Sequence, residues 1–274
     1  SFEKMRCNIL QTKDILCLMH MENMVLGIAF GTAVTVFRNS HVDGYKGTYN
    51  QIKLCDIENE APRVFPIPGN RFSQVSARNF SKIPGAPVAY WVSEKFVSTF
   101  SSGISIDTIS KYTGSQNITA DNEKYLRTVW EIEAGKVGQN CRWVFYIKGG
   151  TFRKWYGNIE LVVDWSNEAR MFYKNNPTSN LLAEQYRFRE GITYTELTSG
   201  VNSFRYLPPI AIFDKKGPCI VDVEHNSYCL AFFNTCVAPE YFKLLNPTIT
   251  LQVKDVKNTP ILFHEQCVHE KVLA

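Results

Sequence analysis

The feature that most constrains the fold is a succession of short β-type runs separated by turn signals after Gly103. The clearest example is the stretch 148–164, KGGTFRKWYGNIELVVD. In it, Gly149-Gly150 and Gly157-Asn158 favour turns, and the apolar run 159–163 favours a strand. We therefore expect an α/β (α+β) chain whose later part is a mixed, mostly antiparallel and curved sheet.

The same reasoning places the other elements along the chain. The beginning predicts a helix at 2–10, a strand at 15–21 and a second apolar run at 28–37. Further strands are expected at 104–106, 128–133, 143–147 and 210–213, and further helices at 93–99, 180–189, 227–235 and 241–245. Prolines and polar residues between Glu58 and Ser81 are typical of a linker.

Basic and aromatic residues gather between the two turn signals of the stretch 148–164. Lys148 precedes the first turn, and Arg153, Lys154, Trp155 and Tyr156 lie between the turns. Cations hold phosphates and flat rings stack on bases or sugars, so this pattern predicts nucleic-acid binding. An aromatic-rich core turn with solvated basic residues explains the pattern equally well, and the stretch alone does not decide between them.

Gln116 and Asn117 follow a short polar loop and are candidates for bidentate hydrogen bonds to adenine. The alternative is a turn in which the polar side chains cap the local backbone.

A second basic and aromatic cluster runs from Tyr186 to Tyr206. Its candidate DNA contacts are Arg187, Arg189, Tyr194, Ser203, Arg205 and Tyr206. Arginines two positions apart share a side only in extended chain, because a helix would turn them apart by ~200°. Residues 142–206 hold nine Lys/Arg and six Asp/Glu, so most of the net charge of +4 lies here. Scattered surface cations remain the alternative to a binding face.

Composition and motifs limit the other classes of function. Hydrophobic residues make up 45% of the 274 residues and charged residues 20%, which indicates a folded chain. We expect no membrane span and no secretion signal, and free buried thiols of a cytoplasmic protein for most of the 8 cysteines. His264, Cys267 and His269 match no familiar metal spacing, so no metal site is expected.

Several segments resemble, in order, the C-terminal half of PglX-type adenine-specific DNA methyltransferases of the BREX phage-defence systems. They are IAFGTAVTVFR, YKGTYNQI, KIPGAPVAYWVSEKF, TGSQNITADNEKYLRTVWEI, KGGTFRKWYGNIELVVDW, REGITYTELTSGVNSFRYLP, FDKKGPCI and LLNPTITLQVKDVKNTPI. The last is also similar, more loosely, to the end of target recognition domains in type I restriction specificity subunits. The resemblance covers nearly the whole chain and implies a DNA-recognition role.

The resemblance also implies what this chain lacks. Such methyltransferases carry a Gly-containing loop for S-adenosylmethionine and an Asn-Pro-Pro-Tyr type motif, and neither occurs here. Both Asn-Pro dipeptides are followed by Thr178 or Thr248, with no ring to stack on a flipped base. By the family pattern Ser1 falls just after the catalytic motif, so we expect a fragment or truncated product with no catalytic residues and no bound cofactor of its own. The parent enzyme would use S-adenosylmethionine.

The resemblance divides the chain into residues 1–70, the end of a Rossmann-like catalytic domain plus linker, and residues 71–274, a target recognition domain. Expected partners are double-stranded DNA and other methyltransferase or defence-system subunits. The strands of residues 1–70 would be sheet edges without neighbours, so we expect them to pack on the recognition domain or on a second copy in a homodimer. The alternative function is a protein–protein adaptor of a defence complex that reads no DNA.

Overall fold

The computed structural model describes residues 2–59, 61–68, 72–112, 116–246 and 248–263. The chain forms two compact units, Ser1–Ser102 and Gly103–Ala274, and each is described by itself. The tail with His264, Cys267 and His269 lies outside the described residues. Across the described ranges, no helix has the length and apolar character needed to cross a membrane.

The first unit is built on a four-stranded sheet of order β2-β1-β3-β6, in which β1 and β3 are parallel and the outer pairs are antiparallel. Its elements are α1 (Glu3–Thr12), β1 (Asp14–Met21), β2 (Thr32–Arg38), β3 (Gly47–Ile52), the 3-10 helix η1 (Leu54–Asp56), β4 (Ile57–Glu58), β5 (Ala61–Pro62), β6 (Phe72–Val75), the 3-10 helix η3 (Ala77–Lys82) and α2 (Glu94–Ser102). Buried aromatic rings hold the unit together: Tyr49 stacks on Tyr90 at 5.3 Å and meets Phe80 edge-on at 5.6 Å.

The first unit confirms the expected helix at 2–10 and the strand at 15–21. The strands of residues 1–70, which we expected to lack neighbours, pair with one another in this sheet. Strand β2 is then one edge of the sheet. Val34 and Val36 of β2 are exposed there. Packing of this edge on a second copy stays a prediction.

The second unit contains two further four-stranded sheets, of order β14-β10-β11-β9 and β13-β12-β15-β8. Its strands are β7 (Ile104–Ser105), β8 (Lys111–Tyr112), β9 (Leu126–Thr128), β10 (Trp143–Ile147), β11 (Leu161–Asp164), β12 (Gly191–Tyr194), β13 (Phe204–Leu207), β14 (Ala211–Phe213), β15 (Cys219–Val221) and β16 (Pro260–Ile261). Its helices are α3 (Asn122–Tyr125), η4 (Val129–Glu131), η5 (Ala134–Lys136), α4 (Asn167–Asn175), η6 (Glu184–Tyr186), α5 (Asn226–Phe233), α6 (Ala238–Leu245) and α7 (Val253–Lys257).

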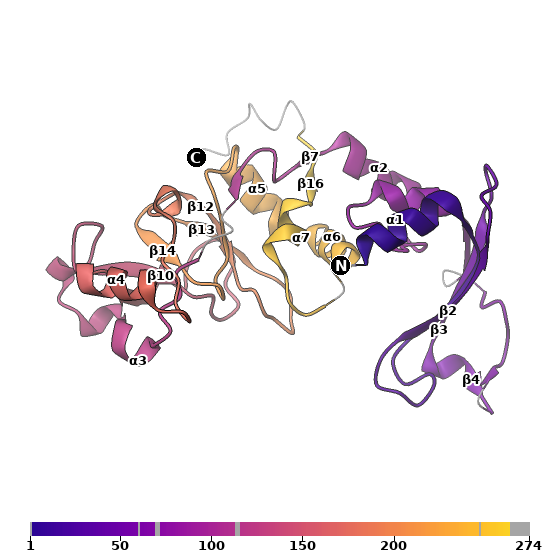
Figure 1. Ribbon diagram of the computed structural model, residues 1–274, viewed down its shortest axis with the longest axis horizontal. Helices are drawn as coiled ribbons and strands as arrows, with labels where there is room; N and C mark the ends of the chain where they lie inside the picture. The colour runs from indigo at the N-terminus through magenta and orange to yellow at the C-terminus, as the bar shows by residue number, and fades with distance from the viewer. Residues whose placement is uncertain (1, 60, 69–71, 113–115, 247, 264–274) are drawn as a thin grey trace. The chain divides into compact units, whose positions relative to one another are not determined.

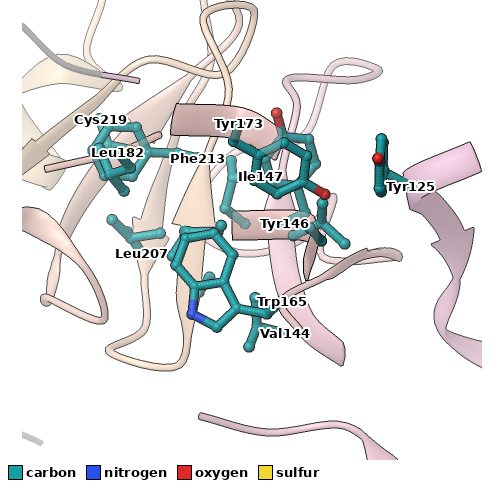
Figure 2. Close-up of a cluster of buried hydrophobic side chains, with 14 of the residues drawn as sticks. Tyr125, Val144, Tyr146, Ile147, Trp165, Tyr173, Leu182, Leu207, Phe213 and Cys219 are labelled. Carbon is teal, nitrogen blue, oxygen red and sulfur yellow. The ribbon is translucent and has the colours of Figure 1, made fainter. Parts of the chain in front are cut away.

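Two hydrophobic cores lie against these sheets, and the core around β10 and β11 also takes Leu207, Cys219 and Val221 from β13 and β15 of the other sheet. Around β10 and β11, the rings of Tyr146, Trp165 and Tyr173 pack with aliphatic side chains, as Figure 2 shows. Helix α4 contributes Tyr173, whose hydroxyl donates to the carbonyl of Asp164 at 2.9 Å. The other core lies where α5, α6 and α7 gather beside β12 and β13 (Figure 1), and there Phe204 stacks on Phe233 at 4.7 Å.

The predicted α/β class is confirmed, with antiparallel pairing in all strand pairs of the second unit but β10–β14. The strand predicted at 143–147 is β10, and the helices at 227–235 and 241–245 correspond to α5 and α6. The helix predicted at 180–189 is wrong, because only Glu184–Tyr186 turns as a 3-10 helix. The reason is tertiary: Asn180 is extended and exchanges backbone hydrogen bonds with Ile118.

The boundary between the two compact units falls between Ser102 and Gly103 in the sequence. The functional boundary was expected earlier, after residue 70. Strand β6 pairs with β3 of the first sheet, which explains why the residues around it group with the first unit. Where DNA recognition would begin along the chain stays a prediction.

Candidate nucleic-acid interface

The loop 148–160 joins β10 to β11 and carries half of the predicted basic and aromatic residues. Its first turn is tightly packed, because a Cβ added to Gly149 would lie 2.7 Å from the carbonyl oxygen of Lys216. Gly149 also has a φ of +79°, which L side chains rarely adopt. The loop therefore leaves β10 along a path that only glycine permits.

The middle of the loop is fixed by backbone hydrogen bonds to β13, an edge strand of its sheet. The N–H of Trp155 donates to the carbonyl of Phe204 at 2.9 Å, and the N–H of Tyr206 donates to the carbonyl of Trp155 at 2.8 Å. Trp155 thus forms an isolated parallel β-bridge with Arg205, and its φ of +74° lies in the left-handed region.

This attachment leaves three aromatic side chains of the loop in solvent. Phe152 is 62% exposed, Trp155 52% and Tyr156 61%. Large apolar rings in water raise the free energy of the surface, so a cluster of them on a fixed loop is typical of a binding site.

Two of the three predicted cations of the loop, Arg153 and Lys154, have partners within the chain. Arg153 lies 3.6 Å from Glu160, and both side chains are more than half exposed. Such a surface ion pair contributes ~0–1 kcal/mol to stability, so it leaves Arg153 able to bind another anion. The Lys154 ammonium donates to the carbonyl of Asn234, just beyond the end of α5, at 2.8 Å. Lys148 is half-buried, and that burial lowers its pKa.

Arg205 lies beneath the loop and is fully buried. Its guanidinium donates to the Ser203 hydroxyl and to the Thr195 hydroxyl, each at 3.2 Å, and to the carbonyl of Arg153 at 3.4 Å. Burial lowers the pKa of Arg205. Because these acceptors come from the residue before β13, from the residue after β12 and from the loop, Arg205 joins the loop to the sheet below it. In this conformation neither Arg205 nor the buried Ser203 reaches a DNA groove.

Gln116 and Asn117 lie in a different place, beside the core around β10 and β11. Asn117 is fully buried, its carbonyl accepts from the Tyr146 hydroxyl at 2.6 Å, and its side-chain oxygen accepts from the N–H of Leu182 at 3.3 Å. The carbonyl of Gln116 accepts from the Asn180 side chain. Asn117 therefore joins backbone segments that are distant in the sequence, which differs from the local backbone capping of the alternative interpretation.

The second predicted cluster is divided by the fold. Tyr206 lies next to the loop, and burial and the nearby Glu190 raise its pKa. Arg189 faces Asp222, donating from Nε to its carboxylate at 2.9 Å, and Tyr194 is buried in the core beside α5 and α6. Arg187 lies against Trp165. The structure thus brings Arg153, Lys154, Trp155, Tyr156 and Tyr206 together, with Arg205 and Ser203 buried beneath them and Lys148 at the start of the same loop. The remaining candidates lie elsewhere: Gln116, Asn117, Arg187, Arg189 and Tyr194.

Sequence reasoning passed over Phe152, although it stands next to Arg153 in the same run of rings and cations. It also passed over Arg170, whose closeness to Arg187 arises only in the fold. Across the described residues there is no group of three or more His, Cys, Asp or Glu that could hold a metal ion.

Comparison with known proteins identifies relatives. The adenine-specific methyltransferase PglX of Lacticaseibacillus casei (strain Zhang) is 31% identical over a region that covers 84% of this chain and 21% of PglX. The adenine-specific methyltransferase BrxX of Escherichia coli O9:H4 (strain HS) is 26% identical over 96% of this chain and 22% of BrxX. The chain thus spans about a fifth of the length of these relatives. No protein-family model matches it.

Proposed function

We propose that this chain supplies the DNA-contacting part of a PglX-type adenine-specific methyltransferase of the BREX systems. The proposal starts from the confirmed similarity of the chain to a region of such enzymes. In the whole protein the methyl group would pass from S-adenosylmethionine to an adenine amino group. This chain's own share would be to hold double-stranded DNA. The observation that carries the proposal is the loop 148–160, which presents exposed rings and Arg153 from a backbone fixed on β13.

The residues of the loop would divide the work by their chemistry. Arg153, exposed and weakly paired, suits a phosphate oxygen, and its contact would not depend on base sequence. Trp155 and Tyr156 suit sugars or base faces, because their rings give apolar area without charge. Arg205 would act from below, by holding the loop in the position that these contacts need.

An adaptor function is the second candidate, and one observation favours it. Both cations of the loop have partners within the chain, Glu160 for Arg153 and the Asn234 carbonyl for Lys154, whereas the rings have most of their surface in solvent. A surface dominated by exposed rings also suits a protein partner. The two functions differ in their dependence on salt, since only phosphate binding releases many counterions.

The test is DNA binding by the full chain at several salt concentrations, on duplexes of mixed sequence. We expect Arg153→Ala to weaken binding about equally on all duplexes and to reduce the slope of log K against log salt by about 1. Trp155→Ala should weaken binding by ~1–3 kcal/mol with little change of that slope.

The matched control is Lys136→Ala. Lys136 is also exposed and paired with one carboxylate, Glu133, at 2.8 Å. It lies near the other end of β10, because the neighbouring Val137 pairs with Trp143. If Arg153→Ala behaves like this control, or if the wild type shows no salt-dependent binding, the adaptor function replaces DNA binding.

A further inference from the structure

A hollow of about 500 Å³ lies at the end of β11 that is remote from the loop 148–160. Trp165, the residue after β11, is one of its lining residues, together with Arg170 of α4 and Arg187 after η6. The Arg187 guanidinium carbon is 5.4 Å from the centre of the Trp165 ring, and that of Arg170 is 5.9 Å away. Two guanidinium groups are thus held against one buried indole.

Neither guanidinium forms an ion pair with a carboxylate of the described residues, although Glu184 also lines the hollow. Among the described residues no carboxylate lies within 4.0 Å of Arg170 or Arg187, whereas the nearby Arg142 binds Asp164 at 2.8 Å. Arg187 donates from Nε to the carbonyl of Leu182 at 2.9 Å, and Arg170 donates to the side chain of Asn167. The Nε of Arg170 is buried with no hydrogen-bond partner in the described part of the chain.

Two cations that line one hollow in half-buried positions repel each other more strongly than they would in water. Burial and the charge of Arg170 both lower the pKa of Arg187, although Glu184 acts against them. The indole compensates only in part, since each cation–π contact is worth ~0.5–2 kcal/mol. An anion bound by both groups would remove the repulsion between the two guanidinium charges. Its oxygens would accept hydrogen bonds from the free N–H groups of both arginines.

We propose that Arg170 and Arg187, held in place by Trp165, bind a phosphate group in this hollow. The planar guanidinium offers paired N–H donors that match phosphate oxygens, and stacking on a ring leaves those donors in the plane free. Asn140, which also lines the hollow, adds an amide donor of the same kind.

The source of the phosphate is the DNA backbone, and this part of the inference rests on the proposed function. Strand β11 separates the hollow from the loop, and its four residues at ~3.3 Å each span ~13 Å. That length corresponds to about four base steps of one DNA strand at 3.4 Å per step. The two ends of β11 would therefore contact separate phosphates of one duplex. A free phosphate or nucleotide is the other source of the same chemistry.

The experiment uses the full chain and two measurements. The first is binding of inorganic pyrophosphate at constant ionic strength, followed by calorimetry and by the rise in melting temperature. We expect the wild type to bind pyrophosphate, and Arg170→Gln and Arg187→Gln each to weaken that binding about tenfold or more. Lys243→Ala serves as the control, because Lys243 is exposed and paired with Glu240 at 2.9 Å away from the hollow.

The second measurement is the salt dependence of duplex binding. We expect the doubly substituted protein to lose about one to two from the slope of log K against log salt. If pyrophosphate binding needs both arginines but this slope is unchanged, the site binds a free phosphate and the DNA assignment is wrong. If the wild type binds no DNA at all, the proposed function fails while the pyrophosphate result still decides the anion site.

The anion site itself is overturned if pyrophosphate does not bind, or binds equally to Arg170→Gln, Arg187→Gln and wild type. Arg187→Lys gives a further check in case a glutamine variant unfolds. It keeps the charge but loses the paired donors, so we expect intermediate affinity and an unchanged circular dichroism spectrum. Full pyrophosphate affinity in Arg187→Lys would contradict paired-donor recognition.

Discussion

Asn234 links the end of α5 to strand β13 through its buried side chain, and its main-chain carbonyl accepts from Lys154 of the loop 148–160. Its amide oxygen accepts from the N–H of Phe204 at 3.1 Å, and its amide nitrogen donates to the carbonyls of Phe204 and Leu230 at 3.0 and 3.1 Å. The side chain therefore occupies the place of a neighbouring strand at this point of β13. Replacement by alanine removes all three bonds at once.

The expected cost follows from what is left behind. Phe204 is fully buried, so its N–H would lose its partner without gaining water, at ~1–3 kcal/mol. Each of the other two bonds contributes ~0.5–1.5 kcal/mol, and the carbonyl of Phe204 keeps its bond from Trp155. We therefore expect Asn234→Ala to lower the free energy of unfolding by about 2–6 kcal/mol.

Urea denaturation followed by tryptophan fluorescence measures this cost, since most of the tryptophans, Trp130, Trp143, Trp155 and Trp165, belong to the second unit. Asn226→Ala is the control at the other end of α5. Its side chain is half-buried and makes longer bonds to Glu190 and Gly191, at 3.2 and 3.4 Å, so less than about 1 kcal/mol should be lost.

Hydrogen exchange gives a local measure of the same effect. The amide of Phe204 should exchange faster in Asn234→Ala than in the wild type, by more than global destabilisation alone produces. If both asparagine variants cost the same, and the Phe204 amide is equally protected in each, the assigned role of Asn234 is refuted.

Three further predictions concern other parts of the chain. Gly149→Ala should destabilise the second unit by ~1–3 kcal/mol, because the new Cβ would lie 2.7 Å from the Lys216 carbonyl oxygen at a φ of +79°. Gly135→Ala is the control, since a Cβ there would have nothing within 4 Å, and it should be nearly neutral in thermal melts. Hydrogen bonding to Arg189, with Lys111 acting in the same sense, holds the pKa of Asp222 below its ordinary value of 3.8, so this group stabilises the folded state above pH 3.8 and loses that effect as the pH falls. Asp222→Asn should therefore be less stable than wild type at neutral pH, with a difference that shrinks below pH 3.8; a constant difference would contradict the assignment. Finally, the isolated chain should neither bind S-adenosylmethionine in calorimetry nor transfer a tritiated methyl group to DNA. The reason is that its sequence holds neither the cofactor loop nor the Asn-Pro-Pro-Tyr motif. Saturable binding of S-adenosylmethionine at micromolar concentration would contradict this prediction.

The fold was predictable where a local pattern and its tertiary setting agree. The run Trp143–Ile147 is apolar, rich in β-formers and followed by Gly149-Gly150, and it forms β10 with the predicted bounds. The segment 180–189 has helical spacing, but its backbone pairs with residues near Ile118, a contact that local spacing does not contain. Tertiary pairing therefore overrides propensity there.

The candidate site was predictable only in part, for a related reason. The run FRKWY predicts exposed rings and cations beside a turn, and most of its side chains do lie at the surface. Arg205 has the same chemical character in the sequence, yet it is buried because acceptors from Thr195 and Arg153 surround it. Which cations face solvent depends on such distant neutral acceptors, and residue type alone does not reveal them.

The attachment of Trp155 to β13 has a consequence for how the specificity of this protein can be altered. The bonds that fix the loop join main-chain atoms of Trp155, Phe204 and Tyr206, so they do not depend on which side chains the loop carries. Phe152 and Tyr156 can therefore be exchanged for other residues while the path of the chain persists. Different contact surfaces can therefore be made by changing exposed side chains of the loop, without redesign of the sheet that supports it.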